Sequence, residues 1–138
     1  MTEAAKTLGP ALNAYLLEVT NSTTIERLWA MHCDKMAAYG FDRLLYGFTY
    51  YRTETSLGDP EDFLLLSNHA PDYTDVFVGQ RLYLDAPMTR WAIDHEGVQS
   101  WRRIGARLSA GDLSAAEQRV VDFNLRHGVV AGYTISFK

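Results

Sequence analysis

The sequence predicts a mixed α/β fold, in which short strands with two apolar faces lie among capped amphipathic helices. The strand signal is clearest over residues 43–52 (RLLYGFTYYR), where apolar side chains fill both alternating sets of positions. This pattern is typical of a strand with layers on each side. The helix signal comes from two capping-box patterns, Thr23–Glu26 and Ser114–Glu117, each of which places a carboxylate three residues after a hydroxyl.

The first half of the chain is predicted to contain two helices and then an antiparallel pair of strands. Pro10 suits the first turn of a helix over residues 10–19, and Gly40 supplies a left-handed cap for the second helix. Residues 63–67 (FLLLS) predict a strand that returns antiparallel to residues 43–52 through a turn-rich loop.

The second half of the chain is predicted to contain three helices and two strands. Prolines and the second capping box indicate where the helices begin, and Gly128 indicates where the last helix ends. The predicted helices cover residues 71–81, 87–95 and 114–127, and the predicted strands cover residues 98–101 and 129–137.

Length and composition favour one soluble domain. The 138 residues are enough for one core, and 47% hydrophobic and 12% aromatic residues exclude a disordered chain. A net charge of -4 and a pI of about 5.5 argue against nucleic-acid binding through overall charge. One cysteine, no signal-peptide pattern and no apolar run of about 18 residues predict a cytoplasmic protein that does not enter a membrane.

The sequence contains no convincing catalytic set, so we expect neither an enzyme nor a bound metal or cofactor. It has no glycine-rich phosphate loop and no Gly-x-Ser-x-Gly elbow. His32 and Cys33 are neighbours on a predicted helix and point about 100° apart, which excludes a nucleophile–base pair. The four histidines lack the i, i+4 spacing of metal ligands on a helix.

Residues 68–101 carry the strongest functional signal, because aromatic side chains gather there around a carboxylate in an apolar setting. This combination is typical of a pocket for a small, mostly apolar molecule. The Asp85 carboxylate has three alternative roles in such a setting: it caps the helix that begins at Pro87, it is exposed to solvent, or it accepts a hydrogen bond from a ligand. Trp91 and Trp101 fit core packing as well as ligand contact. The side chains that gather in this stretch are His69, Tyr73, Phe77, Tyr83, Asp85, Met88, Trp91 and Trp101.

The order and spacing of several motifs resemble the autoinducer-binding domain of LuxR-type quorum-sensing regulators, over essentially the whole chain. The family pattern has a polar residue and an aromatic near a short helix, an Asp-Pro pair that opens the next helix, and a Trp after a strand. A helix start of the form Leu-Ser/Thr-x-x-Glu and a Gly-x-x-x-Gly turn follow. The corresponding residues here are Asn68/His69, Tyr73, Asp85-Ala86-Pro87, Trp101, Leu113–Glu117 and Gly128–Gly132.

The resemblance implies an α/β/α sandwich, in which a central antiparallel sheet is flanked by helices on both faces. It also implies an N-acyl homoserine lactone, or a related small signal, buried against one face of the sheet. Asp85 would then accept a charge-assisted hydrogen bond from the ligand amide, Tyr73 and His69 would donate to the head group, and Trp101 would pack on the ring. The remaining predicted ligand contacts are Tyr46, Phe48, Leu64, Leu66, Phe77 and Met88.

Three departures from the family pattern affect the predicted head-group contacts. Tyr73 stands where the family has a tryptophan, His69 stands where it has a tyrosine, and Ala86 separates Asp85 from Pro87. A signal with a different head group or an aryl tail therefore also fits the sequence.

The family's following strand, linker and helix-turn-helix domain do not occur in residues 1–138, so we expect one sensor domain that does not itself bind nucleic acid. The sequence fits either a fragment of a transcription factor or a regulator without a DNA-binding half. The predicted partners are a small-molecule signal and, in a homodimer or heterodimer, a second copy or a full-length regulator. The alternatives are a PAS- or GAF-like sensor of another molecule, a protein-interaction (dimerisation) module and, third, an enzyme such as a lactone hydrolase.

Overall fold

The first helix, α1 (Glu3–Asn21), begins earlier than the sequence predicts. Pro10 lies inside α1 and not at its first turn, because the preceding residues EAAKTL are mostly good helix formers that extend the helix toward the N-terminus. This boundary comes from a computed structural model, which describes the backbone of residues 3–138 and the side chains from residue 9 onward.

The second helix, α2 (Ile25–Ala38), is capped one residue later than predicted. Its N-cap is Thr24, whose hydroxyl oxygen accepts a hydrogen bond from the Arg27 amide at 3.2 Å, so the predicted capping box that begins at Thr23 is wrong. The predicted stop at Gly40 is confirmed. Gly40 has φ +94°, a left-handed conformation that glycine adopts without steric cost.

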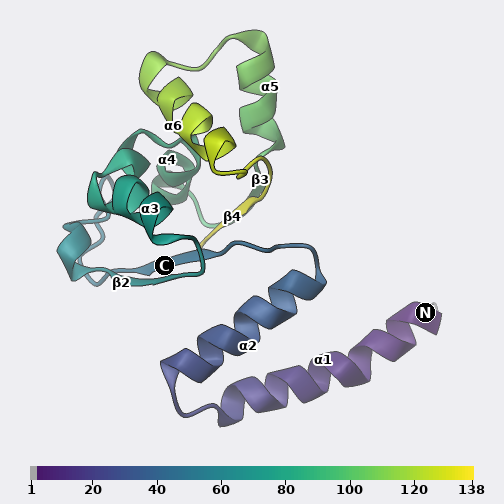
Figure 1. Cartoon of the computed structure of the whole chain (residues 1–138). Coiled ribbons are helices and arrows are strands. Elements are labelled where there is room, and N and C mark those ends of the chain that lie inside the picture. Colours follow the sequence, from purple (N-terminus) through teal and green to yellow (C-terminus); the bar gives the residue numbers. More distant parts are fainter. Residues whose placement is uncertain (1–2) are drawn as a thin grey trace. The chain divides into compact units, whose positions relative to one another are not determined.

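The chain forms two compact units. The first ends at Leu44 and contains α1 and α2, and the second covers Leu45–Lys138 and contains all the strands and the remaining helices (Figure 1). The prediction of one domain over residues 1–138 stays a prediction.

The second unit has two antiparallel two-stranded sheets. In the first sheet, β1 (Leu45–Phe48) pairs with β2 (Leu64–Ser67), which confirms the predicted pairing. In the second, β3 (Gly97–Ser100) pairs with β4 (Tyr133–Ser136). β1, β2 and β4 are shorter than the predicted segments, and β3 has the predicted length but begins one residue earlier. Within the described residues the strands form two separate two-stranded sheets, whereas the sequence predicts one central sheet. The α/β class is confirmed as a mixture of helices and antiparallel strands. A central sheet between two helical layers is not confirmed.

The helices of the second unit follow the predicted order with two differences. The helix predicted over residues 71–81 is α3 (Pro71–Thr74), continued by a wider π-helix (Asp75–Gly79). A 3-10 turn and α4 (Pro87–Asp94) follow, and the predicted helix at Pro87 is thereby confirmed. The sequence reasoning missed α5 (Arg102–Ala110), which contains a glycine and has no side-chain N-cap to signal its start.

The predicted second capping box is present at the start of α6 (Ala115–Arg126). The Ser114 hydroxyl oxygen accepts from the Glu117 amide at 3.1 Å, and a Glu117 carboxylate oxygen accepts from the Ser114 amide at 3.1 Å. Gly128 has φ +73° and ends the helix as predicted.

Arg52 joins the end of α4 to the loop after β1 and to β4. Its guanidinium donates to the carbonyl oxygens of Ala92 and Ile93 at 2.6 and 2.8 Å, and the buried Ser136 hydroxyl also donates to Ala92 at 2.7 Å. The last carbonyls of a helix have no partner inside the helix, and these bonds supply partners for two of them.

Candidate functional site

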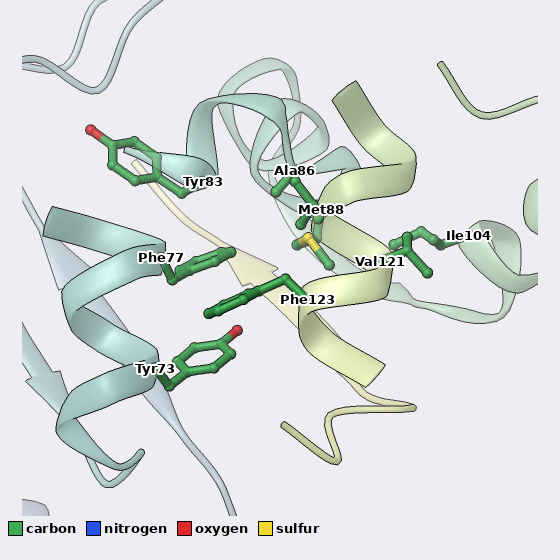
Figure 2. Close-up of a cluster of buried hydrophobic side chains, with 9 residues drawn as sticks. Tyr73, Phe77, Tyr83, Ala86, Met88, Ile104, Val121 and Phe123 are labelled. Carbon is green, nitrogen blue, oxygen red and sulfur yellow. The ribbon is translucent and has the colours of Figure 1, made fainter. Parts of the chain in front are cut away.

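A set of buried apolar side chains from several helical segments forms the core of the second unit. The members labelled in Figure 2 come from α3, the π-helix, the 3-10 turn, the start of α4, α5 and α6. We call them the aromatic cluster, because four of the nine are phenylalanine or tyrosine. Its members are Tyr73, Phe77, Tyr83, Ala86, Met88, Ile104, Val120, Val121 and Phe123.

Tyr73 has the most ring contacts in the aromatic cluster. Its ring stacks on His69 with centroids 4.2 Å apart and an interplanar angle of 12°. Phe77 and Phe123 also lie close to parallel with it, at 5.4 and 5.1 Å, as Figure 2 shows. His127 meets the Tyr73 ring edge-on at 5.3 Å. The arrangement places flat rings beside one another, which is a favourable geometry for aromatic side chains.

One polar pair lies within this apolar surrounding. The Tyr73 hydroxyl donates a hydrogen bond to the Asn124 side-chain oxygen at 2.8 Å, and both residues are only 4% exposed. Asn124 extends from α6, whose neighbouring residues Val120, Val121 and Phe123 are apolar and buried. The hydroxyl proton of Tyr73 and the carboxamide oxygen of Asn124 satisfy each other in this buried position.

Two unusual backbone segments place the rings of Phe77 and Tyr83. Phe77 lies in the π-helix, and π-helical turns often occur at functional sites. Arg81 then adopts a left-handed conformation with φ +60°, which is uncommon for a residue with a side chain. The 3-10 turn Leu82–Asp85 follows and directs Tyr83 into the core. Burial raises the pKa of the Tyr83 hydroxyl above its usual value, although the charge of Arg81 opposes this, so the hydroxyl stays neutral near neutral pH.

Five of the predicted ligand-binding residues meet in or beside the aromatic cluster. Tyr73, Phe77 and Met88 are members of it. His69 stacks on its Tyr73 ring, and Trp101 packs against it while remaining partly exposed. The sequence signal in residues 68–101 therefore corresponds to a real spatial cluster.

Trp101 is held by a hydrogen bond and by a close backbone approach. Its indole N–H donates to the Thr134 hydroxyl oxygen at 2.8 Å. A Cβ atom placed on Gly132 would lie 3.2 Å from the indole ring, so only glycine lets β4 approach the ring without a shift. A buried indole N–H needs a hydrogen-bond acceptor, and for Trp101 that acceptor is the hydroxyl of Thr134 on β4.

Four other predicted ligand contacts share one face of the β1–β2 sheet. Tyr46 lies opposite Leu66 and Phe48 opposite Leu64, so the strand period of two puts all four side chains on the same side. Phe48 and Leu64 are 40% and 43% exposed, and the other two are half-buried. The pairing places these residues in a continuous apolar strip, and none of them belongs to the aromatic cluster. Their contact with a ligand stays a prediction.

Asp85 is not a member of the aromatic cluster. It is half-buried and lines a surface depression of about 280 Å³ together with Arg90, Ser114, Ala116 and Glu117. Its neighbour Ala86 is the residue that enters the cluster, with no exposed surface. The predicted contact of Asp85 with a ligand amide stays a prediction.

An ion pair stabilises the corner between α5 and α6 beside this depression. Both terminal nitrogens of the Arg107 guanidinium donate to the Glu117 carboxylate, at 3.0 and 2.9 Å. The hydrogen bond from Arg107 lowers the pKa of the Glu117 carboxyl below its usual value, although partial burial opposes this. Glu117 therefore serves both the capping box and the ion pair.

The sequence reasoning missed two residues of the site, Phe123 and Asn124. The available signal was the helical spacing on α6, where Val120, Phe123, Asn124 and His127 lie three or four residues apart and so share a face. The spacing marks this face as buried, but it does not reveal which aromatic rings it contacts.

Among the side chains described, from residue 9 to residue 138, no three His, Cys, Asp or Glu groups lie close enough together to hold a metal ion. In residues 3–138 no helix has both the length and the apolarity needed to cross a membrane.

Comparison with known proteins identifies one related family. The family model described as "Autoinducer binding domain" matches residues 24–138, which include α2 and the entire second unit. No curated protein and no solved structure matches the chain.

Proposed function

The chain belongs to the autoinducer-binding domain family, and we propose that it is the signal-binding sensor domain of a LuxR-type quorum-sensing regulator. In this proposal the ligand is an N-acyl homoserine lactone or a related small signal, and the protein binds it without transforming it. The sandwich architecture, a cytoplasmic location and dimerisation with a second copy or a full-length regulator belong to the same proposal.

The observation that carries this proposal is the aromatic cluster, with its single internal polar pair, in the family-matched region. Sites for small ligands are mostly apolar and aromatic, and a few fixed polar groups orient the ligand. Tyr73, Phe77 and Met88 combine these properties at the positions where the sequence predicts a ligand.

The rings of the cluster pack against one another, so ligand binding must move some of them. Moving an aromatic ring out of a close-packed core loses contacts, which the ligand has to replace with its own apolar surface. We therefore expect the ligand to stabilise the second unit strongly, because the bound state would have both a complete core and a new partner. A ligand at a hundred times its dissociation constant adds about 2.7 kcal/mol to the free energy of unfolding.

Thermal unfolding of the purified chain with a panel of acyl homoserine lactones, from N-butanoyl to N-dodecanoyl, tests the proposal. A gain of about 2.7 kcal/mol would raise the midpoint of a unit of this size by roughly 10 °C or more. The same scan on Phe123→Leu, which alters the cluster, should show a smaller shift, while Leu125→Ala on the exposed side of α6 should behave like wild type. No shift with any member of the panel would contradict the sensor function.

The predicted contact between Asp85 and the ligand amide requires a separate comparison. If the carboxylate accepts the amide N–H, Asp85→Asn should lower the affinity for all acyl homoserine lactones by about tenfold or more, since hydrogen bonds to charged groups contribute about 1.5–3 kcal/mol. An unchanged affinity would remove Asp85 from the ligand site and leave the sensor function intact.

An exposed apolar face of β4 supports the alternative role as a protein-interaction module. Val98 lies opposite Ile135, Tyr133 lies two residues before it on the same face, and all three side chains are more than half exposed. A concentration-dependent dimer that Ile135→Asp dissociates, together with no response to any lactone, would favour this role over signal binding. Sedimentation equilibrium with and without the lactone panel separates the two functions.

A further inference from the structure

The strand β4 pairs with β3 along one edge, and its other edge faces away from that strand. The Trp101 amide donates to the Gly132 carbonyl oxygen at 2.9 Å, which makes these two residues a hydrogen-bonded pair in line with the β3–β4 register. Hydrogen-bonded and non-hydrogen-bonded pairs alternate along an antiparallel ladder. Thr134 and Ser136 therefore bond to β3, whereas Ile135 directs its N–H and C=O toward the outer edge. No other strand of residues 3–138 pairs with β4.

The outward-facing positions of this edge carry apolar side chains on an exposed face. Tyr133, Ile135 and Phe137 occupy every second position, so the strand period puts their side chains on the same face. All three are more than half exposed. Val98 of β3 lies opposite Ile135, and their exposed fractions are almost equal at 62% and 63%. The outer edge of β4 thus borders an apolar face that extends onto β3.

This edge lacks the features that usually keep strand edges from pairing. Native proteins protect exposed edges with charged side chains, proline or a β-bulge. Residues 133–137 (YTISF) contain no charge and no proline, and all four β3–β4 pairs follow one register without a bulge. The outer edge of β4 is therefore a template for the addition of another strand.

The edge is complementary to itself in an antiparallel arrangement. A pairing centred on Ile135 places this residue opposite Ile135 of a second copy, and Tyr133 opposite Phe137 of that copy. Both are hydrogen-bonded pairs, because every member is an outward-facing position. Aromatic pairs across strands are favourable. The adjoining Lys138 falls opposite Gly132, and the two Lys138 residues lie at opposite ends, so no like charges meet.

From this self-complementary edge we propose that β4 pairs antiparallel with β4 of a second copy of the chain. The two hairpins then form one four-stranded sheet around a two-fold axis, in the order β3–β4–β4–β3. Val98 and Ile135 of both copies make one apolar row across the four strands. The inference rests on the dimerisation included in the proposed function, and it names the surface that forms the dimer. The same patch serves both copies, as two-fold symmetry requires.

The size of this surface predicts a weak dimer. The four exposed side chains, two aromatic and two aliphatic, offer roughly 400 Å² of apolar surface per copy, since a fully covered aromatic side chain buries about 150–250 Å². A stable interface of standard size covers about 800 Å² per partner. Backbone hydrogen bonds between the strands contribute further affinity. We therefore expect a dissociation constant in the micromolar range.

Cross-linking of single-cysteine variants of the full chain tests the pairing. In a Cys33→Ser background, Ile135→Cys should form a disulfide-linked dimer with oxidised glutathione, because Cα atoms of a hydrogen-bonded pair lie about 5.5 Å apart, within disulfide range. Val98→Cys is the matched control, with 62% exposure against 63% on the same face. Its two copies would be three strand spacings, or about 14 Å, apart and should not cross-link. Equal cross-linking of the two variants would overturn the proposal.

Two further variants test the register of the paired strands. Tyr133→Cys and Phe137→Cys should cross-link to each other when the two chains are mixed. Neither should cross-link to its own copy, because the two copies of either residue lie four positions apart along the strands, about 14 Å. Cross-linking of each variant to itself and not to the other would indicate a different register and would overturn the arrangement centred on Ile135.

Sedimentation equilibrium tests whether backbone hydrogen bonds hold the dimer. Ile135→Pro removes the outward N–H and leaves the bonds to β3 in place, so it should raise the dissociation constant of the dimer at least about tenfold. Ile135→Val keeps the N–H and should stay within about threefold of wild type. Near-ultraviolet circular dichroism establishes that each variant is folded. Equal weakening by both variants would contradict pairing through this edge.

The dimer and the signal are measured separately, so the two proposals can fail independently. A chain that remains monomeric up to about 1 mM overturns this inference. If the lactone panel still stabilises that monomer, signal binding stands and only the inference fails. If the chain dimerises through β4 and no lactone stabilises it, signal binding fails and the inference stands.

Discussion

Replacing Tyr73 by phenylalanine should destabilise the ligand-free chain, because it leaves the side-chain oxygen of Asn124 buried without its donor. The hydrogen bond is 2.8 Å long and both residues are 4% exposed, so water cannot easily replace the missing hydroxyl. A buried acceptor without a partner reduces the free energy of unfolding by about 1–3 kcal/mol. Asn124→Leu should have a cost of similar size, since it leaves the Tyr73 hydroxyl buried instead.

The double variant Tyr73→Phe/Asn124→Leu should be more stable than the two single changes predict. Neither unsatisfied group remains, and leucine has nearly the shape of asparagine while adding apolar contact with Phe123 and its neighbours. Replacing both partners of a buried hydrogen bond by apolar groups can be close to neutral. The coupling energy between the two sites should therefore be about 1–2 kcal/mol.

Urea unfolding measures this coupling. Tryptophan fluorescence in a Trp29→Phe background reports on Trp91 and Trp101, which both lie in the unit Leu45–Lys138. With an m-value of about 1–3 kcal/mol per molar urea, each single change should lower the midpoint by roughly 1 M. If the two single effects simply add in the double variant, the hydrogen bond between the side chains does not contribute as the structure indicates.

Three further predictions concern the parts of the fold that surround the cluster. Thr134→Val removes the acceptor of the Trp101 indole N–H and should lower the free energy of unfolding by about 1–2 kcal/mol in urea, whereas Thr134→Ser should restore most of it; equal effects of the two changes would contradict a role for the hydroxyl. Ser114→Ala removes the helix cap and should lower stability by about 1 kcal/mol, with Ser114→Asp as the control that keeps a capping oxygen. The lowered pKa of Glu117 means that its charged form stabilises the fold above its unfolded pKa and that this contribution is lost as the pH falls through its folded pKa. Between neutral pH and about pH 3, the wild-type unfolding midpoint should therefore fall more than that of Arg107→Met, in which the partner of Glu117 is missing; parallel pH profiles would exclude this ion pair as a source of acid sensitivity.

Local interactions allow the sequence by itself to determine several elements. The Ser114–Glu117 box, the left-handed glycines Gly40 and Gly128, and the proline at the start of α4 involve groups only a few residues apart. Their geometry is therefore decided before distant parts of the chain meet. The apolar runs of β1 and β2, separated by a turn-rich loop, likewise predict their antiparallel pairing.

Other local signals in the sequence do not determine where a helix begins or whether one forms. Pro10 marks a possible helix start, but good helix formers on its N-terminal side continue the helix through it. α5 has no capping side chain and includes Gly105, so neither propensity nor a cap distinguishes it from a loop in the sequence. Its position depends on Ile104, which is buried in the cluster, and that contact is tertiary.

The tertiary structure alone decides which side chains meet in the candidate site. Tyr73 and Asn124 are 51 positions apart, and no local pattern links a tyrosine near one proline to an asparagine inside a later helix. The π-helical turn and the left-handed Arg81 direct Ala86 into the core and leave Asp85 at the surface depression. Composition and spacing identify a stretch of aromatic residues that becomes buried, because burial and helix period are properties of short segments. Which polar groups face that region is determined by packing between distant segments, which only the folded chain specifies.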